Sequence, residues 1–122
     1  MILIKNNKMY EIPKTLIEKL ENKGYSVVIG ETDCCISKYS SAGQDFFFTV
    51  DIGENLNDFA ENIYDYGESF DVDEEAYLWI GSDGHGINGA PYHISDIVKD
   101  MEECGNMIYE AYKIVTEYIE KK

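Results

Sequence analysis

The sequence predicts an α+β fold, with a three- to four-stranded antiparallel meander sheet packed on one face by two or three helices, including a long C-terminal helix. Runs rich in β-branched and aromatic residues follow one another at 25–30, 33–39 and 45–52. Their short connections most simply produce a meander. Apolar residues then recur at helical spacing over 54–68 and 95–119, so we expect both helices to cover the same sheet face.

The segment before these strands predicts a further strand and a helix. Residues 1–5 alternate weakly and are expected to form a short first strand. Pro13 is well placed for the first turn of a helix, and Gly24 stands where a C-terminal glycine belongs. The apolar residues between them recur at threes and fours. We therefore expect a helix between these two positions.

The second half of the chain predicts two further helices separated by a loop. Asp71, with Glu74 three residues on, has the form of a capping box, and a short helix is expected to continue through Ile80. Glycines make 81–91 a loop. At ~1.5 Å per residue, the last helix should run nearly 40 Å. Gly105 is expected to bend it, because glycine weakens a helix interior.

The composition indicates one acidic domain spanning residues 1–122. The chain carries 24 acidic and 10 basic side chains, for a formal net charge of −14 at pH 7, and 44% of it is hydrophobic. This length and apolar content suit a single core. The charge opposes direct binding to nucleic acid or to an anionic membrane, since both carry the same sign. Without an apolar run of roughly 18–20 residues or a secretory layout, we expect a cytoplasmic protein.

The cysteines indicate reduced thiols. Cys34 and Cys35 are adjacent, and Cys104 lies far along the chain. An odd count without framework spacing argues against a disulfide-stapled secreted domain. Neighbours on a strand face opposite sides, so at most one of the adjacent pair should join a given core layer. We interpret all three as structural.

The most informative feature is an acidic stretch. From position 39 to position 98, between Lys38 and Lys99, sixty residues contain thirteen acids and no lysine or arginine. In the predicted helix the acids step by four, three, four and three residues. At about 100° per residue they fall inside an arc of about 80°, opposite the apolar side. The residues predicted to bind a partner are Glu54, Asp58, Glu61, Asp65, Glu68, Asp71, Asp73, Glu74 and Glu75.

Two interpretations of this row remain open. Charge runs often serve only solubility. Alternatively, carboxylates one helical turn apart lie ~5–6 Å from each other, which is comparable with the phosphates of one nucleic-acid strand. The row would then mimic nucleic acid and occupy a basic site on a DNA- or RNA-handling protein.

The competing function is an adaptor or homo-oligomeric interaction domain. Its partner would contact an aromatic surface, and the acidic face would serve only solubility. Tyr64 and Tyr66, on the flanks of the acidic helix, suit the interface of a nucleic-acid mimic as well, because tyrosine is enriched at interfaces. A homodimer is therefore also left open. An enzyme is a third hypothesis, although nothing selects one catalytic pair from 24 carboxylates.

The glycine-rich loop predicts neither a nucleotide nor a metal site. Gly84–Gly89 matches G-x-G-x-x-G, but Pro91 and a helix follow it, with no strand downstream. His85 and His93 lack the cysteine pair or the helical histidine spacing of a zinc site. We expect no metal, no cofactor and no catalytic residue. Whether the loop binds any ligand stays open.

Three stretches carry a family resemblance: SAGQDFFF at 41–48, YGESFDVDEEA at 66–76, and LWI at 78–80 together with GAPYHISDIVKDME at 89–102. They are similar to small acidic hypothetical proteins of gut Clostridia and their mobile elements. The resemblance covers roughly residues 40–110, and the loop Gly84–Gly89 departs from it. That group has no established activity, so no catalytic residue is carried over. The resemblance implies a bacterial cytosolic protein of a phage or conjugative element, and such elements often carry acidic nuclease inhibitors.

Overall fold

The computed structural model describes residues 11–121, and its α+β architecture confirms the predicted fold class. The elements, in chain order, are α2 (Lys14–Asn22), β1 (Ser26–Ile29), β2 (Asp33–Tyr39), β3 (Asp45–Asp51), α3 (Leu56–Ser69), α4 (Val72–Tyr77) and α5 (Ile94–Glu120). The strand expected at 1–5 lies outside the described residues. Within 11–121 no helix is long and apolar enough to cross a membrane.

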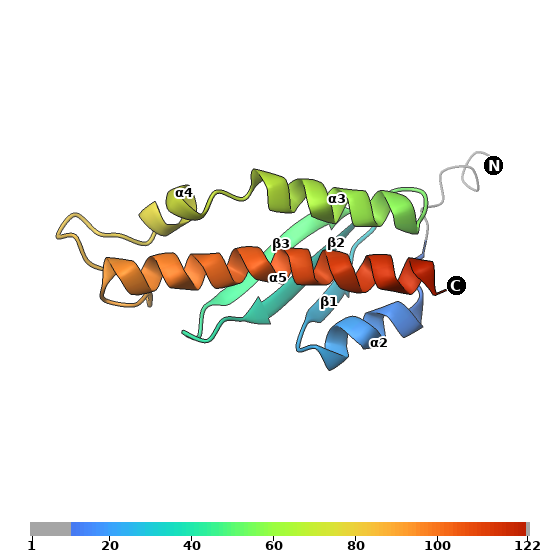
Figure 1. Ribbon diagram of the computed structural model, residues 1–122, viewed down its shortest axis with the longest axis horizontal. Coiled ribbons are helices and arrows are strands. Elements are labelled where there is room, and N and C mark those ends of the chain that lie inside the picture. Colours follow the sequence, from blue (N-terminus) through green and yellow to red (C-terminus); the bar gives the residue numbers. More distant parts are fainter. Residues whose placement is uncertain (1–10, 122) are drawn as a thin grey trace.

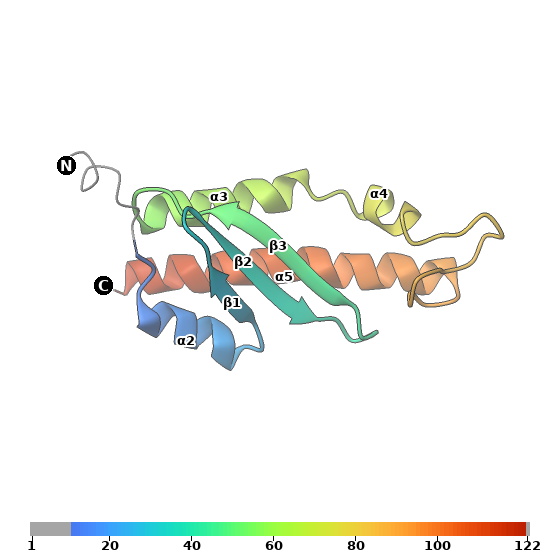
Figure 2. The same cartoon turned by 180° about the vertical axis from the view of Figure 1, so that it is seen from behind.

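The described sheet is an antiparallel meander of three strands in the order β1-β2-β3. Ile36 of β2 pairs with Val27 on one side and with Phe48 on the other. Helices α3 and α5 cover one face of the sheet, and α2 flanks the β1 edge (Figure 1). Among residues 11–121, no helix covers the opposite face (Figure 2). The predicted one-sided packing is therefore confirmed.

The main core fills the space between the sheet and its helices. Strand residues that face the helices alternate with residues that face outward, because side chains on a strand switch sides at every position. Helices α3 and α5 supply apolar stripes at helical spacing that meet the strands. The largest fully buried side chains of this core are Phe48, Phe59, Leu16, Leu20, Ile36, Ile52, Ile63, Ile108 and Val115.

A second apolar cluster lies between α4 and the first half of α5, where Ala76 meets Ile97 and Met101. Here α4 ends at Tyr77 instead of continuing through Ile80 as predicted. The chain leaves the helix because the backbone of Ile80 forms an isolated bridge with Gly86.

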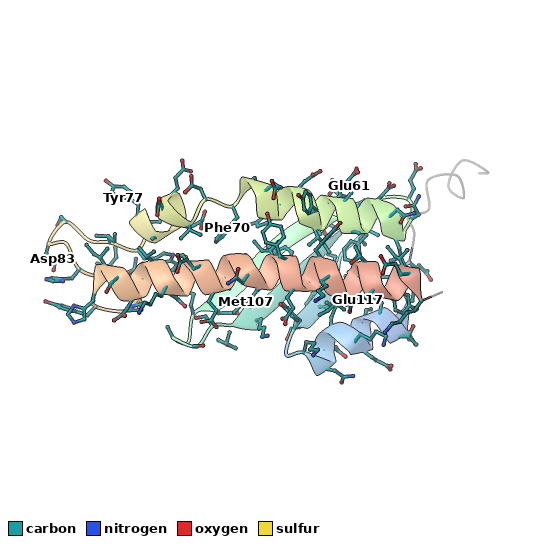
Figure 3. All side chains as sticks on the ribbon, viewed as in Figure 1. Glu61, Phe70, Tyr77, Asp83, Met107 and Glu117 are labelled. Carbon is teal, nitrogen blue, oxygen red and sulfur yellow. The ribbon has the colours of Figure 1, made fainter. Side chains whose placement is uncertain are left out.

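Helix α5 is unbroken through Gly105 and runs straight along its whole length (Figures 1 and 2), so the predicted bend there is wrong. A Cβ atom at this position would lie 3.3 Å from Cδ2 of Phe70. The glycine therefore allows the Phe70 ring to pack closely against the helix, as Figure 3 shows for the labelled ring between α3 and α5. The helical hydrogen bonds on both sides keep the helix straight through the weak position.

All three cysteines are free thiols, and the adjacent pair divides between the two sheet faces as predicted. Cys34 is buried in the main core and Cys35 is half-buried on the open face. Burial raises the pKa of the Cys34 thiol to about 12. Burial likewise raises the pKa of Cys104 to about 12. Both thiols are therefore protonated at neutral pH.

Candidate functional site: the acidic ridge of α3 and α4

The predicted acids follow one long edge of the molecule, along α3 and α4 and the residues that precede each helix (Figure 1). We call the nine residues Glu54, Asp58, Glu61, Asp65, Glu68, Asp71, Asp73, Glu74 and Glu75 the acidic ridge. Glu61 lies on the outer side of α3, away from α5 (Figure 3). The apolar side of the same helix, including Phe59 and Ile63, is fully buried. The amphipathic division predicted for this helix is therefore present.

The ridge begins in a helix cap. Helix α3 starts at Leu56, so Glu54 precedes the helix instead of belonging to it as predicted. Oδ1 of Asn55 accepts a hydrogen bond from the Asp58 N–H at 2.9 Å, and Asp58 Oδ2 accepts one from the Glu54 N–H at 3.0 Å. Asn55 is thus the N-cap of α3, and the Asp58 carboxylate binds the N–H one residue before the cap, where a true capping box would bind the N–H of the cap residue itself. The Asp58 carboxylate is thus occupied in closing the helix.

Gly53 makes this cap possible. Its φ of +79° lies in the left-handed region, which glycine adopts without strain. A Cβ atom at Gly53 would lie 2.5 Å from Cβ of Asp58. The tight turn before α3 therefore requires glycine, and it presses the loop against the Asp58 side chain.

Glu68 connects the ridge to α5. Its carboxylate accepts a hydrogen bond from the phenol of Tyr109. That hydrogen bond is the main cause that raises the pKa of Tyr109 to about 12. The Tyr109 ring also packs edge-on against Tyr64, with ring centroids 6.0 Å apart. Glu68 therefore holds the C-terminal turn of α3 on its neighbour.

Two of the four acids at α4 also have contacts within the molecule. Asp71 is the N-cap, as predicted, and its Oδ1 accepts hydrogen bonds from the N–H groups of Asp73 at 3.0 Å and Glu74 at 3.2 Å. Glu75 is half-buried. Burial chiefly raises the pKa of Tyr66, and the Glu75 charge raises it further. The Glu75 charge also raises the pKa of Cys104, so the Glu75 carboxylate lies near both Tyr66 and Cys104.

Five ridge carboxylates remain available. Within residues 11–121 their side chains are exposed and make no hydrogen bond or ion pair: Glu54, Glu61, Asp65, Asp73 and Glu74. Glu61 and Asp65 are one turn apart on the same face of α3, a separation of ~5–6 Å between side chains. No lysine of the sequence falls between Lys38 and Lys99 to neutralise them. The ridge therefore presents uncompensated negative charge to solvent.

The aromatic flank of α3 is smaller than the sequence predicted. The ring of Tyr66 packs on Phe48 with centroids 5.2 Å apart, so it belongs to the core. Tyr64 is 41% exposed and leans on Tyr112. Sequence reasoning overlooked Phe47, which is 61% exposed on the open sheet face. The strand period could have identified it, because the middle residue of three consecutive phenylalanines must face away from the other two.

The glycine loop is closed by its own backbone. The N–H of Gly86 donates to the carbonyl of Tyr92 at 3.1 Å, and that of Ile87 donates to the carbonyl of Trp79 at 2.9 Å. A Cβ atom at Gly86 would lie 1.8 Å from the Pro91 carbonyl oxygen. These N–H groups are therefore engaged inside the loop, and this glycine is required by the close approach of the chain.

The two histidines have structural contacts. The ring of His85 stacks on Tyr92 with centroids 3.9 Å apart. His93 is the N-cap residue of α5, although its side chain makes no capping hydrogen bond. Within 11–121 neither imidazole hydrogen-bonds to a carboxylate. The same residues contain no group of three His, Cys, Asp or Glu side chains that could hold a metal ion.

Comparison of the chain with protein families, with curated protein sequences and with solved structures found no match.

Proposed function

We propose that this chain is a non-catalytic binding protein whose acidic ridge occupies a basic site on a DNA- or RNA-handling protein, in the manner of an anti-restriction or anti-CRISPR inhibitor. The observation that carries this proposal is the pair of unpaired carboxylates on Glu61 and Asp65, which face solvent one turn apart. The expected compartment is the bacterial cytoplasm. The resemblance to small acidic proteins of clostridial mobile elements supports only the bacterial context of this proposal, because that group has no established activity.

The attachment of α3 to the domain favours this proposal. Electrostatic mimicry depends on charges that are already held in position, because ordering them on binding would cost conformational entropy. The hydrogen bonds of Asn55 and Asp58 fix the first turn of α3, and the bond from Tyr109 to Glu68 fixes the last. Phe59 and Ile63 hold the middle of the helix in the core. The hydrogen-bonded acids Asp58 and Glu68 thus hold the helix that presents the free carboxylates of Glu61 and Asp65.

The test is a pull-down from a bacterial host lysate at about 50 and about 500 mM salt, which bracket weak and strong screening. We expect a nucleic-acid-binding protein to be recovered at low salt only and to be displaced by added double-stranded DNA. The Glu61→Lys/Asp65→Lys variant should lose it, because the central charges are reversed. Asp58 is avoided as a target, since its substitution would also remove the helix cap.

A matched control reverses two exposed acids elsewhere. Glu18→Lys/Glu21→Lys on α2 changes the net charge by the same amount and should retain the partner. Equal recovery of a partner at both salt concentrations, or equal loss in the control variant, would overturn the proposal. Circular dichroism of both variants verifies that the fold survives.

A second candidate function, an adaptor or homo-oligomeric domain, is favoured by the open face of the sheet. Val28, Tyr39 and Phe47 are 66%, 69% and 61% exposed there. In this alternative the open face meets the partner and the acids maintain solubility. Sedimentation equilibrium distinguishes the two functions: a dimer that persists at high salt and dissociates in Phe47→Ser supports the second.

A further inference from the structure

Asp100 is a buried carboxylate whose Oδ1 has no hydrogen-bond partner among the described residues. The residue is only 4% exposed. It lies on the buried stripe of α5, next to Met101 and between Ile97 and Cys104. Buried polar atoms in folded proteins are nearly always paired, since an unpaired charge in the interior is costly. The missing partner of Asp100 therefore needs an explanation.

A pocket of about 390 Å³ lies beside this carboxylate. It is formed where the β2–β3 hairpin, at Ser41 and Ala42, and the segment at Pro91 approach the first half of α5. Both ribbon views show the hairpin tip beside this part of α5 (Figures 1 and 2). The tip lies across α5 from α4 (Figure 1), so the pocket is separate from the acidic ridge.

The pocket is acidic. Asp96, Asp100 and Glu103 all line it, and their spacing of four and three residues places them on one side of α5. Lys99 also lines the pocket, so its four charged groups sum to −2 when three carboxylates are set against one ammonium. The Glu103 carboxylate is held by Ser41, at 2.8 Å from the backbone N and 3.0 Å from Oγ. These two hydrogen bonds fix the side of the pocket where the hairpin meets α5.

We propose that this pocket binds an alkylguanidinium group, with Asp100 as its principal partner. From Asp96 to Glu103 the helix rises ~10 Å, so the carboxylates are spread out and do not converge on a point. A guanidinium is a planar cation with five N–H donors and can bridge separated carboxylates in a way that a compact ion cannot. Its alkyl stem would lie on Ala42 and Pro91. An arginine side chain and a small free guanidine share this chemistry.

The experiment titrates the ¹⁵N-labelled chain with agmatine and, separately, with the peptide acetyl-Gly-Arg-Gly-amide, and it follows backbone amide shifts. We expect saturable shifts at Ala42, Lys99 and Asp100 with at least one of the two probes. Asp100→Asn should weaken binding about tenfold or more, because it removes the charge from the main hydrogen-bond acceptor. Asp51→Asn is the matched control, on exposed Asp51 of β3 outside both the pocket and the acidic ridge, and it should bind as the wild type does.

A thermal measurement separates binding from folding. Ligand that binds only the folded state raises the melting temperature. Whichever probe gives saturable shifts should therefore raise the melting temperature of the wild type and leave the melting temperature of Asp100→Asn unchanged. Without ligand, Asp100→Asn should melt no lower than the wild type, since it removes an unpaired buried charge. Saturation by agmatine alone or by the peptide alone identifies the source of the guanidinium.

Three results would overturn the proposal. Shifts that stay linear, or that are equal in Asp100→Asn, mean surface ion pairing only. Saturation of the same amides by CaCl₂ instead of the guanidinium probes would make the pocket a metal site. No response to any probe would leave Asp100 paired only with water. The ridge proposal is unaffected by each result, because none of these residues belongs to it.

Discussion

Tyr25 and Glu110 form a hydrogen bond of 2.7 Å that joins the residue before β1 to the second half of α5. The same hydroxyl lies 2.8 Å from the carbonyl oxygen of Met107, so its single hydrogen is shared between the two acceptors. The Lys38 ammonium is 3.5 Å from Glu110 and 4.7 Å from the centre of the Tyr25 ring. These contacts fasten the sheet to the helix that covers it.

Removing this hydroxyl should destabilise the fold. In Tyr25→Phe the Met107 carbonyl and the Glu110 carboxylate lose their shared donor, and we expect the free energy of unfolding in urea to fall by about 1–3 kcal/mol. Tyr118→Phe is the control, because its hydroxyl bonds Thr15 in an exposed position. Equal losses in the two variants would contradict a special role for the buried bond.

Stability should depend on pH through Glu110. The hydrogen bond from Tyr25 lowers the pKa of Glu110 below 4.5, with Lys38 assisting. A lowered folded-state pKa contributes stability that is present above the ordinary pKa and lost as pH falls through the lowered value. The unfolding free energy of wild type minus that of Glu110→Gln should therefore shrink between about pH 5 and about pH 3. The effect is reduced by solvent, since the side chain is 45% exposed. A constant difference would contradict this account.

The N-cap of α3 should contribute measurably to the free energy of unfolding. Asn55→Ala removes the oxygen that accepts from the Asp58 N–H, and we expect a loss of about 1 kcal/mol in the free energy of unfolding. Asn57→Ala replaces an exposed residue inside the helix and should cost nothing or stabilise slightly. Chemical denaturation of both variants checks this, and a loss at Asn57 alone would show that the cap is elsewhere.

Two adjacent phenylalanines should behave oppositely. Phe48 is 2% exposed in the core and Phe47 is 61% exposed on the open face. We expect Phe48→Ala to cost about 3–5 kcal/mol, because it leaves a cavity. Phe47→Ala should cost less than about 1 kcal/mol and raise solubility. A large loss at Phe47 in the monomer would mean that the open face is covered.

The thiols should differ in reactivity. Burial protects Cys34 and Cys104 and raises the pKa of each to about 12, whereas Cys35 is half-buried on the open face. Native protein should release one equivalent of thionitrobenzoate from Ellman's reagent quickly and three after denaturation, one for each cysteine of the chain. Absence of the fast reaction in Cys35→Ser would complete the assignment, and a fast reaction that persists in that variant would contradict it.

Much of the fold was predictable because its signals are local. The range 33–39 predicted for the second strand coincides with β2, since turn residues stand on both sides of it, at Gly30 before the strand and at 40–43 after it. Helix α5 extends its predicted range by one residue at each end because its apolar stripe is long and regular. The bend predicted at Gly105 was wrong because the conformation there depends on a contact that is not local. Helix propensity is a local quantity, whereas the packing of Phe70 against that glycine depends on a residue 35 positions earlier, from 70 to 105.

The candidate site likewise has features that local spacing predicted and features that depend on contacts between residues distant in the sequence. Periodicity alone placed Glu61 and Asp65 on the solvent side of α3. Local spacing also predicted Asp71 as a cap, because an N-cap acts within three residues, although within residues 11–121 the Glu74 carboxylate makes no return hydrogen bond and the predicted capping box is only half formed. No local pattern marked Glu68 as the partner of Tyr109, which lies 41 positions away. The unpaired state of Asp100 likewise follows from how the hairpin and α5 meet.

The sequence by itself determined the fold class, the order of the elements and the excess of acids along one helix, since each is expressed in spacings shorter than a few turns. Only the tertiary structure decided which acids are free, which face of the sheet stays open and where a buried charge lacks a partner. The physical reason is that hydrogen bonds and packing act between side chains close in space, and folding brings residues from distant positions together.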